Sequence, residues 1–175
     1  MNKLSATDYN LAASTDSTAS EALGSGRFER DGFLSKITVE GEVPVELNME
    51  QLELLLYGAG YSTGSVVNTT DWEIVPDDIV GNWMTVGAND LDNNMFEYGV
   101  DCLINTLKIS TGLQAFVTAT AGFIGMDHIT QQVKNTGTIT PLDSESLICL
   151  GAKIREVSTD VTNEIESVDL TFDNK

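Results

Sequence analysis

The stretch Met95–Asp127, MFEYGVDCLINTLKISTGLQAFVTATAGFIGMD, decides the fold of this chain. It predicts two long β-strands joined by a tight turn at Thr111-Gly112-Leu113-Gln114, where the glycine allows the chain to reverse. β-Branched residues are dense in both arms, which is typical of side chains that pack on a pleated surface. The stretch therefore predicts a long antiparallel hairpin within a broad sheet.

Alternation along the two arms predicts which side chains share a face, because successive residues of a strand point to opposite sides. We place on the apolar face Leu103, Leu107, Ile109, Ala115, Val117, Ala119, Ala121 and Phe123. We place on the polar face Cys102, Thr106, Lys108, Ser110, Thr118, Thr120 and Gly122. The hairpin thus offers a sheet with one apolar and one hydroxyl-rich face, and no catalytic constellation.

The charge balance narrows the class of partner. The chain has 175 residues, of which 41% are hydrophobic, and its nine basic and 27 acidic residues give a formal net charge of -18. Such an acidic surface is unfavourable for gripping nucleic acid or docking on anionic lipid, since both need clustered Lys and Arg. It suits a halophilic or very soluble protein, or a surface that repels a polyanion.

The domain organisation follows from composition. Residues 1–26 are rich in Ser, Thr and Ala and have few large apolar side chains, so we expect a flexible N-terminal arm, followed by one β-rich domain over 27–175. The N-terminus has no secretory signal, and no run reaches the roughly 18 apolar residues of a membrane span. We expect a cytosolic protein, and we favour buried thiols over a disulfide for Cys102 and Cys149.

An extended segment and one helix precede the hairpin. From Phe33 to Leu47 the pattern predicts a strand in which Glu40, Glu42 and Glu46 share one side, while Pro44 indicates an edge or a bulge. Asn48 is a suitable N-cap for a helix over Met49–Tyr57.

Within this helix we expect a buried stripe and a defined end. Gln51 completes the capping pattern with Asn48, and Gly58 is placed as the left-handed terminator. The stripe comprises Met49, Leu52, Leu55 and Leu56.

The remaining segments predict short strands and polar connections. Strands are expected near Trp72–Val75, Trp83–Val86, Leu147–Val157 and Glu164–Phe172. In the last of these, we expect Val168, Leu170 and Phe172 to face inward. Gly87–Asn94 and Met126–Asp143 are predicted as connections. The fold class is therefore mainly β with one helix.

Candidate chemistry is sparse. Asp90-Leu91-Asp92-Asn93-Asn94 has the composition of a calcium loop, but Met95 stands where the EF-hand needs glycine and Asp101 stands where it needs glutamate, so a solvated turn is favoured. His128 is the only histidine, and no nucleophile elbow accompanies it. We therefore expect no catalysis, no metal site and no cofactor.

The hairpin also resembles the tail tube proteins of long-tailed bacteriophages. The residues that carry the resemblance are Tyr98-Gly99-Val100-Asp101-Cys102-Leu103-Ile104-Asn105-Thr106-Leu107-Lys108-Ile109-Ser110 and Phe116-Val117-Thr118-Ala119-Thr120-Ala121-Gly122-Phe123-Ile124-Gly125-Met126-Asp127. Gly41–Leu47 running into Leu54-Leu55-Leu56, and Ser167–Asn174, add flanking matches, so that the resemblance covers roughly Gly26–Asn174.

This resemblance implies a β-sandwich or barrel with one flanking helix, hexameric rings whose inner sheet runs on between neighbours, and rings that stack into a hollow tube for DNA ejection. Implied partners are other copies, the tape measure, the tail terminator and the baseplate or tip, and the implied location is the virion tail, assembled in host cytoplasm. We expect the channel to be lined by Glu40, Glu42, Thr118 and Thr120. We expect contacts between subunits or rings at Leu54, Tyr57, Asp90 and Asp92.

Two alternatives stay open at this point. One is another ring-forming tail component, such as a terminator or the inner tube of a contractile injection system. The other is a soluble β-sandwich module that binds calcium or carbohydrate.

Overall fold

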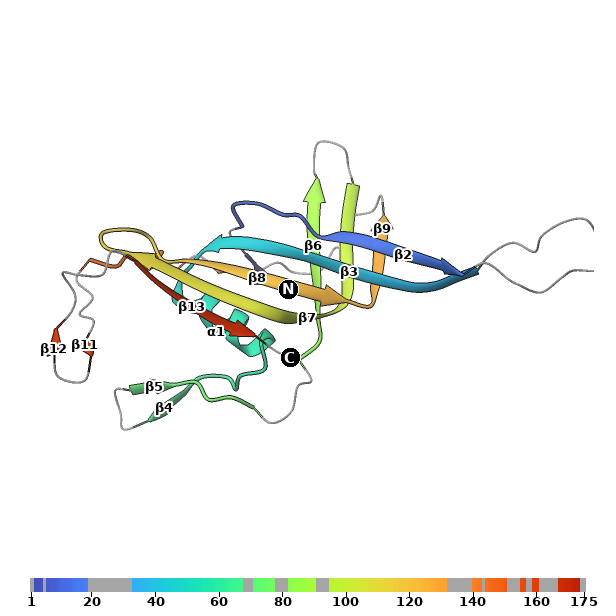
Figure 1. Ribbon diagram of the computed structural model, residues 1–175. Coiled ribbons are helices and arrows are strands. Elements are labelled where there is room, and N and C mark those ends of the chain that lie inside the picture. The colour runs from blue at the N-terminus through green and yellow to red at the C-terminus, as the bar shows by residue number, and fades with distance from the viewer. Residues whose placement is uncertain are drawn as a thin grey trace, which may run out of the picture.

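The computed structural model describes residues 2–4, 6–18, 33–67, 71–77, 82–90, 95–131, 140–142, 144–150, 155–156, 159–160 and 167–173. Within them the fold is mainly β with one helix, as predicted (Figure 1). The elements are β1 (Asn2–Lys3), β2 (Ala12–Thr18), β3 (Phe33–Glu46), α1 (Met49–Gly58), β4 (Ser65–Val67), β5 (Asp71–Glu73), β6 (Met84–Asp90), β7 (Met95–Gly112), β8 (Thr118–Gly125), β9 (Asp127–Gln131), β10 (Thr140–Pro141), β11 (Arg155–Glu156), β12 (Thr159–Asp160) and β13 (Ser167–Asp173).

The main sheet has seven strands in the order β13-β7-β8-β3-β2, with β6 and β9 also paired to β7. The predicted hairpin is confirmed, because β7 and β8 pair antiparallel from Leu103 to Ser110. Its turn lies further along the chain than predicted. β7 continues through Gly112, and the left-handed residue is Gln114, with φ 58°. Backbone hydrogen bonds between Gln114 and Cys149 (2.9 Å) and between Cys149 and Ala115 (3.0 Å) hold this turn in place.

β7 serves two parts of the sheet because it bends at Asp101. Its first part, Met95–Val100, pairs with β6 and β9, whereas the part after the bend pairs with β8 and β13 and, at Cys102, also with Met84 of β6 (Figure 1). Asp101 has φ 51°, a conformation that few residues other than glycine adopt. At the bend, a Cβ on Gly125 would lie 2.6 Å from Cys102 Sγ, so the close packing there requires glycine.

A bulge in β7 reverses the alternation that the sequence predicted. The register with β8 shifts between Ile104 and Thr106, which leaves Asn105 without a counterpart. Cys102 is fully buried on the core side together with Ile104. The prediction that Leu103 faces the core and Cys102 faces outward is therefore wrong, because one inserted residue exchanges the two faces of the strand before it.

Helix α1 begins as predicted and ends one residue later. Asn48 Oδ1 accepts a hydrogen bond of 2.7 Å from the Gln51 backbone N–H, which caps the first turn. The left-handed residue at the C-terminal end is Gly60, with φ 89°, and not Gly58 as predicted. Gly58 is helical and packs so closely on Met84 and Ile104 that a Cβ would collide with both.

The predicted stripe of α1 is only partly right. Leu55 is buried and Leu52 and Leu56 are half-buried against the core, as predicted. Met49 is 53% exposed, because the buried side of the helix is centred on Gln51, Leu55 and Gly58. These positions are four and three residues apart and share one face of the helix. Met49, in the first turn, is left off that face.

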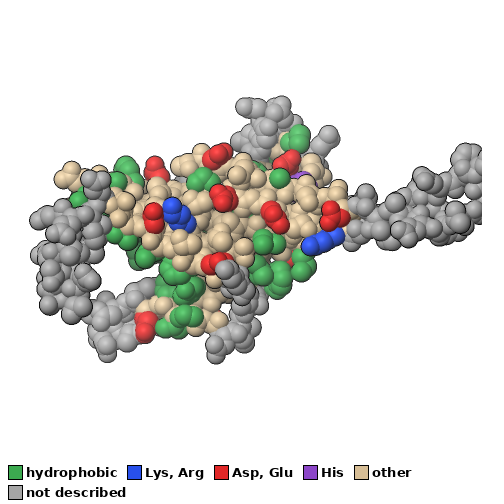
Figure 2. Space-filling view, in the orientation of Figure 1, with side chains coloured by type: hydrophobic (Ala, Val, Ile, Leu, Met, Phe, Trp, Pro, Cys, Tyr) green, Lys and Arg blue, Asp and Glu red, His purple; other side chains and the backbone are tan. Residues whose placement is uncertain are grey.

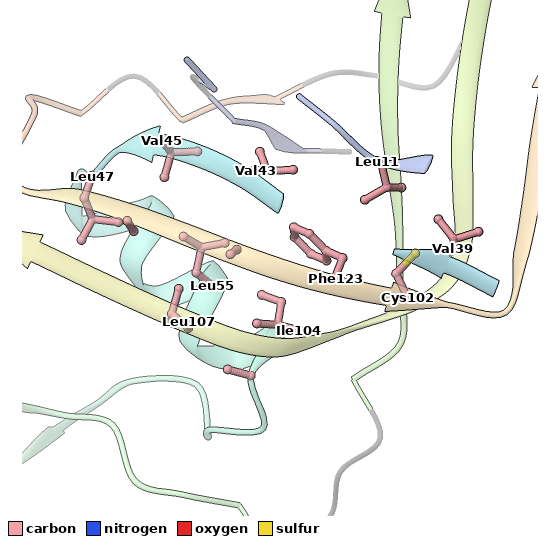
Figure 3. Packing of buried hydrophobic residues seen from close by; sticks show 13 residues of the cluster. Leu11, Val39, Val43, Val45, Leu47, Leu55, Cys102, Ile104, Leu107 and Phe123 are labelled. Carbon is pink, nitrogen blue, oxygen red and sulfur yellow. The ribbon is translucent and has the colours of Figure 1, made fainter. Parts of the chain in front are cut away.

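The core lies between α1 and the adjoining face of the sheet, which we call the inner face (Figure 3). Alternate residues of β3 and β8 point into it, as predicted. The buried cluster comprises Leu11, Val39, Val43, Val45, Leu47, Leu55, Ala59, Cys102, Ile104, Leu107, Ala119, Ala121 and Phe123. Both cysteines are free, with Cys102 buried and Cys149 partly exposed.

The N-terminal region contains a strand that the sequence did not indicate. β2 pairs antiparallel with β3 from Ala12, opposite Glu40, to Thr18, opposite Phe33. Its Ala, Ser and Thr residues give no apolar alternation, so only the pairing with β3 reveals it. Residues 19–26 lie outside the described part of the chain, and the flexibility of residues 1–26 stays a prediction.

Pro44 lies beyond the end of the β2–β3 pairing, with β8 on one side and residues 6–7, which contact β3 at isolated positions, on the other. Its carbonyl oxygen accepts 2.9 Å from the Thr7 backbone N–H, so the side of Pro44 that lacks an N–H faces away from β8. The ladder between β3 and β8 therefore loses no hydrogen bond.

Tertiary pairing also converts predicted connections into strands. β6 runs to Asp90, so the predicted polar loop Gly87–Asn94 is wrong over its first four residues. β9 occupies part of the predicted connection Met126–Asp143. Both strands pair with the first part of β7, and no local sequence pattern predicts this pairing. Where described, the predicted strand Leu147–Val157 is an isolated bridge at Ile148 and the short strand β11.

Candidate functional site

Strands β13, β7, β8, β3 and β2 have a second face that α1 does not cover, and we call it the outer face (Figure 1). Cross-strand pairing aligns its side chains in rows. The rows are Asp169 with Ser110, Thr118 and Glu46; Thr171 with Lys108, Thr120 and Pro44; Asp173 with Thr106, Gly122 and Glu42; and Leu103 with Ile124 and Glu40.

The four residues expected to line a channel all lie on this outer face. Glu40, Glu42 and Thr118 are exposed, and Thr120 is half-buried. They come from two neighbouring strands, β3 and β8, whose alternation places them on the side opposite the core. That this face borders a channel stays a prediction.

The outer face is acidic. Figure 2 shows Asp and Glu side chains spread over it, with few Lys or Arg side chains between them. The acidic members are Asp16, Glu40, Glu42, Glu46, Asp169 and Asp173, and the basic members are Lys36 and Lys108. Because like charges on one surface sum to a negative potential, this face repels a phosphate backbone that comes within about 10 Å.

One ion pair fixes the edge of this face. Lys108 Nζ lies 3.6 Å from Asp169 Oδ2 across the pairing of β7 with β13, and both side chains are about half exposed (51% and 53%). A hydrogen bond from the Ser110 side chain, together with the Lys108 charge, lowers the pKa of Asp169 from its usual value. Asp169 therefore keeps its negative charge to lower pH than an isolated carboxylate.

Both margins of the sheet are open within the described residues. There β13 pairs only with β7, and β2 pairs only with β3. Each strand has seven residues and thus presents a row of backbone N–H and C=O groups that can pair with another strand. On β13, Leu170 lies opposite Ile109 and therefore on the inner face, as the alternation predicted for it with Val168 and Phe172, although it is 53% exposed at this margin.

The residues expected at contacts between subunits do not gather with the outer face. Leu54 is half-buried and Tyr57 is 38% exposed, and both lie on α1, on the other side of the sheet. Asp90 is the last residue of β6, and Asp92 lies outside the described residues. Their role in assembly stays a prediction.

The described residues offer little to a metal ion. Among them, no group of three His, Cys, Asp or Glu side chains is placed to hold one. His128 lies in β9 opposite Gly99, and residues 91–94 of the calcium-like loop are outside the described part. No helix that the structure describes is long and apolar enough to cross a membrane.

Alternation placed Glu46 on the same side of its strand as Glu40 and Glu42, as the structure confirms. Sequence reasoning missed the acidic residues that neighbouring strands add to the outer face, which are Asp16 through the pairing of β2 with β3 and Asp169 and Asp173 through the pairing of β13 with β7. For Asp169 and Asp173 no signal was available, because the sequence does not say which strand the last strand pairs with.

Comparison with known proteins agrees with the resemblance seen at the hairpin. No curated protein sequence matches the chain. A family model described as phage tail tube protein matches residues 3–175, which include every described strand of the outer face. Since the match spans almost the whole chain, the protein belongs to the phage tail tube protein family.

Proposed function

We propose that this chain is the repeating subunit of a tail tube in which copies form hexameric rings, the rings stack, and DNA leaves through the central channel. Family membership supports a structural role in the virion tail. The observation that carries the finer proposal is the outer face, a broad acidic sheet surface that α1 leaves uncovered and that ends in open strand edges on both sides.

Copies join through those edges. The free edge of β13 in one copy pairs with the free edge of β2 in the next, which extends the sheet and satisfies the exposed backbone groups. Each contact of this kind uses two different surfaces, so a suitable rotation between copies closes a ring. The outer faces of all copies then form one continuous surface.

The outer face borders the channel. The inner face is occupied by the core and α1, so only the outer face is available to a large neighbour. The glutamates of β3 and the aspartates of β13 repel the DNA phosphates, while Thr118 and Thr120 add neutral hydroxyls. DNA therefore slides past without specific binding, since the clustered cations that hold DNA are lacking on this face.

Other tail proteins meet the tube at its channel and ends. We expect the tape measure within the channel, and the terminator and the baseplate or tip at the two ends. Assembly takes place in the host cytoplasm.

Electron microscopy of the purified protein over a range of concentrations tests the assembly. We expect rings and stacked tubes with a hollow centre. A protein that stays monomeric at every concentration contradicts the proposal.

A charge-reversal pair tests the channel assignment. In phage that carry Glu40→Lys and Glu42→Lys, we expect normal tubes but slower DNA release, because the wall now attracts phosphate. The matched control is Glu50→Lys with Glu73→Lys, which changes the net charge equally on α1 and on β5, away from the outer face. Unchanged ejection by the first pair, or equal slowing by the control, rejects the channel assignment.

A further inference from the structure

The two strands at the open margins of the sheet, β13 and β2, run in the same direction. Every neighbouring pair in the order β13-β7-β8-β3-β2 is antiparallel, so the strand direction reverses at each of the four steps from β13 to β2. An even number of reversals restores the direction. Copies in a closed ring are related by rotation about one axis, so they also keep their strand direction. Where β13 of one copy meets β2 of the next, the two strands must therefore pair in parallel.

The two margins match in length and are suited to pairing. β2 and β13 have seven residues each, and neither contains a proline or a lysine, which are common in edge strands that must stay unpaired. Each strand can therefore offer N–H and C=O groups along its whole free edge. A strand added beside β13 also covers Leu170, which is 53% exposed in the single copy.

The two margins lie at different levels along the strands (Figure 1). Through β7 and β8, Asp169 is level with Glu46 of β3, whereas Ser14 is level with Thr38. Residues 46 and 38 are eight apart on β3, so β13 and β2 lie fully side by side only if the next copy is displaced by eight residues along its strands. Over five strands spaced about 4.8 Å apart, with about 3.3 Å per residue, this displacement is a strand tilt of roughly 48°. Strands in closed barrels tilt by about 35–45°, so the displacement is close to that of a closed ring.

The acidic side chains favour this register over its neighbours. Asp16 is the only acidic residue of β2, and in this register it lies beside Thr171 of the next copy. A shift of two residues in one direction puts Asp16 beside Asp169, and a shift of two in the other direction puts it beside Asp173. Like charges at adjacent positions destabilise a sheet, and a shift of one residue exchanges the two faces of the strand.

We propose that β13 of one copy and β2 of the next form a parallel ladder of seven residue pairs, from Ser167 beside Ala12 to Asp173 beside Thr18. The inference rests on the proposed function, and it adds the orientation and the register of the contact between copies. Since the contact joins two different strands, each copy uses one margin on either side, and no β13 or β2 edge stays unpaired in a closed ring.

Engineered disulfides test the register. Residues at the same level of neighbouring strands have Cα atoms about 4.8 Å apart, within the range of about 4.4–6.8 Å that a disulfide spans. Ala12→Cys with Ser167→Cys should therefore cross-link copies when assembled rings are oxidised, in a Cys149→Ser background that removes the partly exposed native thiol. Within one copy the two positions lie on opposite margins, at least roughly 19 Å apart at about 4.8 Å per strand. We expect a series of covalent multimers on a non-reducing gel, which reduction removes.

A second pair and two matched controls complete the experiment. Thr15→Cys with Leu170→Cys, on the inner face, should cross-link in the same register. Ser14→Cys with Ser167→Cys is displaced by two residues, which puts the Cα atoms roughly 8 Å apart and beyond the reach of a disulfide. Ser14→Cys with Thr171→Cys fits only the opposite two-residue shift or an antiparallel pairing. We expect both controls to stay monomeric on the gel.

Electron microscopy of the same samples separates failure of this inference from failure of the proposed function. If rings form but neither predicted pair cross-links, or if either control cross-links as readily as the predicted pairs, the parallel register is overturned while the proposed function stands. If the parent protein forms neither rings nor tubes, the proposed function fails and the inference fails with it.

Discussion

The two faces of the sheet are built from the same strands and have opposite characters. Along β3, Val43 and Val45 are buried on the inner face, and Glu42 and Glu46, which flank them in the sequence, are exposed on the outer face. The inner face packs against α1, whereas the outer face has no layer over it among the described elements (Figure 1). We infer that the inner face determines stability, and that the outer face can change charge without affecting the fold.

The largest expected effect is the loss of stability caused by a substitution in the core on the inner face. Leu55→Ala removes a helix side chain that is 2% exposed at the centre of the core, and we expect it to lower the free energy of unfolding by about 3 kcal/mol. Urea denaturation measures this. Met49→Ala, on the same helix but 53% exposed, should cost less than about 1 kcal/mol. Equal costs would show that α1 is not packed as described.

A second substitution tests how closely the N-terminal segment packs on the sheet. In Gly41→Ala the new Cβ would lie 2.5 Å from Leu11 Cα, which is backbone and cannot simply rotate away. We expect a loss of about 1–3 kcal/mol in the free energy of unfolding. The adjacent change Glu42→Ala, on the outer face, should stay within about 0.5 kcal/mol. A neutral Gly41→Ala would indicate that residues near Leu11 do not cross β3 there.

Tyr9 makes the stability of the folded state depend on pH in the alkaline range. Burial first, and then the nearby charges of Glu97 and Cys102, raise the pKa of Tyr9 from 10.0 to about 12. The folded state thus holds this proton more tightly than the unfolded state, so the contribution of Tyr9 to stability is constant below pH 10 and is lost as the pH rises from 10 to about 12. Burial also raises the pKa of the Cys102 thiol, which acts in the same direction.

Tyr9→Phe should make this alkaline decline shallower. The Tyr9 hydroxyl is buried with no hydrogen-bond partner among the described residues, so its removal should also raise stability near neutral pH by on the order of 1 kcal/mol. Denaturation midpoints at several pH values between neutrality and pH 11 measure both effects. An unchanged pH dependence would contradict the buried position of the ring.

The smallest expected effect concerns the outer face. Because the Ser110 hydrogen bond is the largest single cause of the lowered pKa of Asp169, Ser110→Ala should raise that pKa toward its usual value. NMR titration of the Asp169 carboxylate measures the change. The stability contributed by a lowered pKa is present at neutral pH and is lost as the pH falls through it. An unchanged pKa in Ser110→Ala would show that Ser110 does not bond to this carboxylate.

Local patterns predicted the parts of the fold whose cause is local. The hairpin, the Asn48 cap of α1 and the alternation of β3 and β8 follow from residue type and spacing, and the structure has all three. The bulge at Asn105 could not be predicted, because nothing in the composition marks an inserted residue. The strand β9 was missed because its partner is distant in the sequence.

The same distinction holds for the candidate site. Alternation placed Glu40, Glu42, Thr118 and Thr120 on one face, since each lies on a strand with a clear period. It could not show that β13 adds Asp169 to that face, because the choice of neighbouring strand is a property of the whole fold. Nor could it show that Leu103 joins the outer face, which depends on the bulge.

A cryo-electron microscopy reconstruction of the assembled protein tests the central claim most directly, because it shows which side of the sheet borders the channel. The account predicts that Glu40, Glu42, Thr118 and Thr120 line a hollow channel and that α1 lies toward the outside of the tube. A reconstruction in which α1 lines the channel, or in which the acidic face points to the exterior, would contradict it.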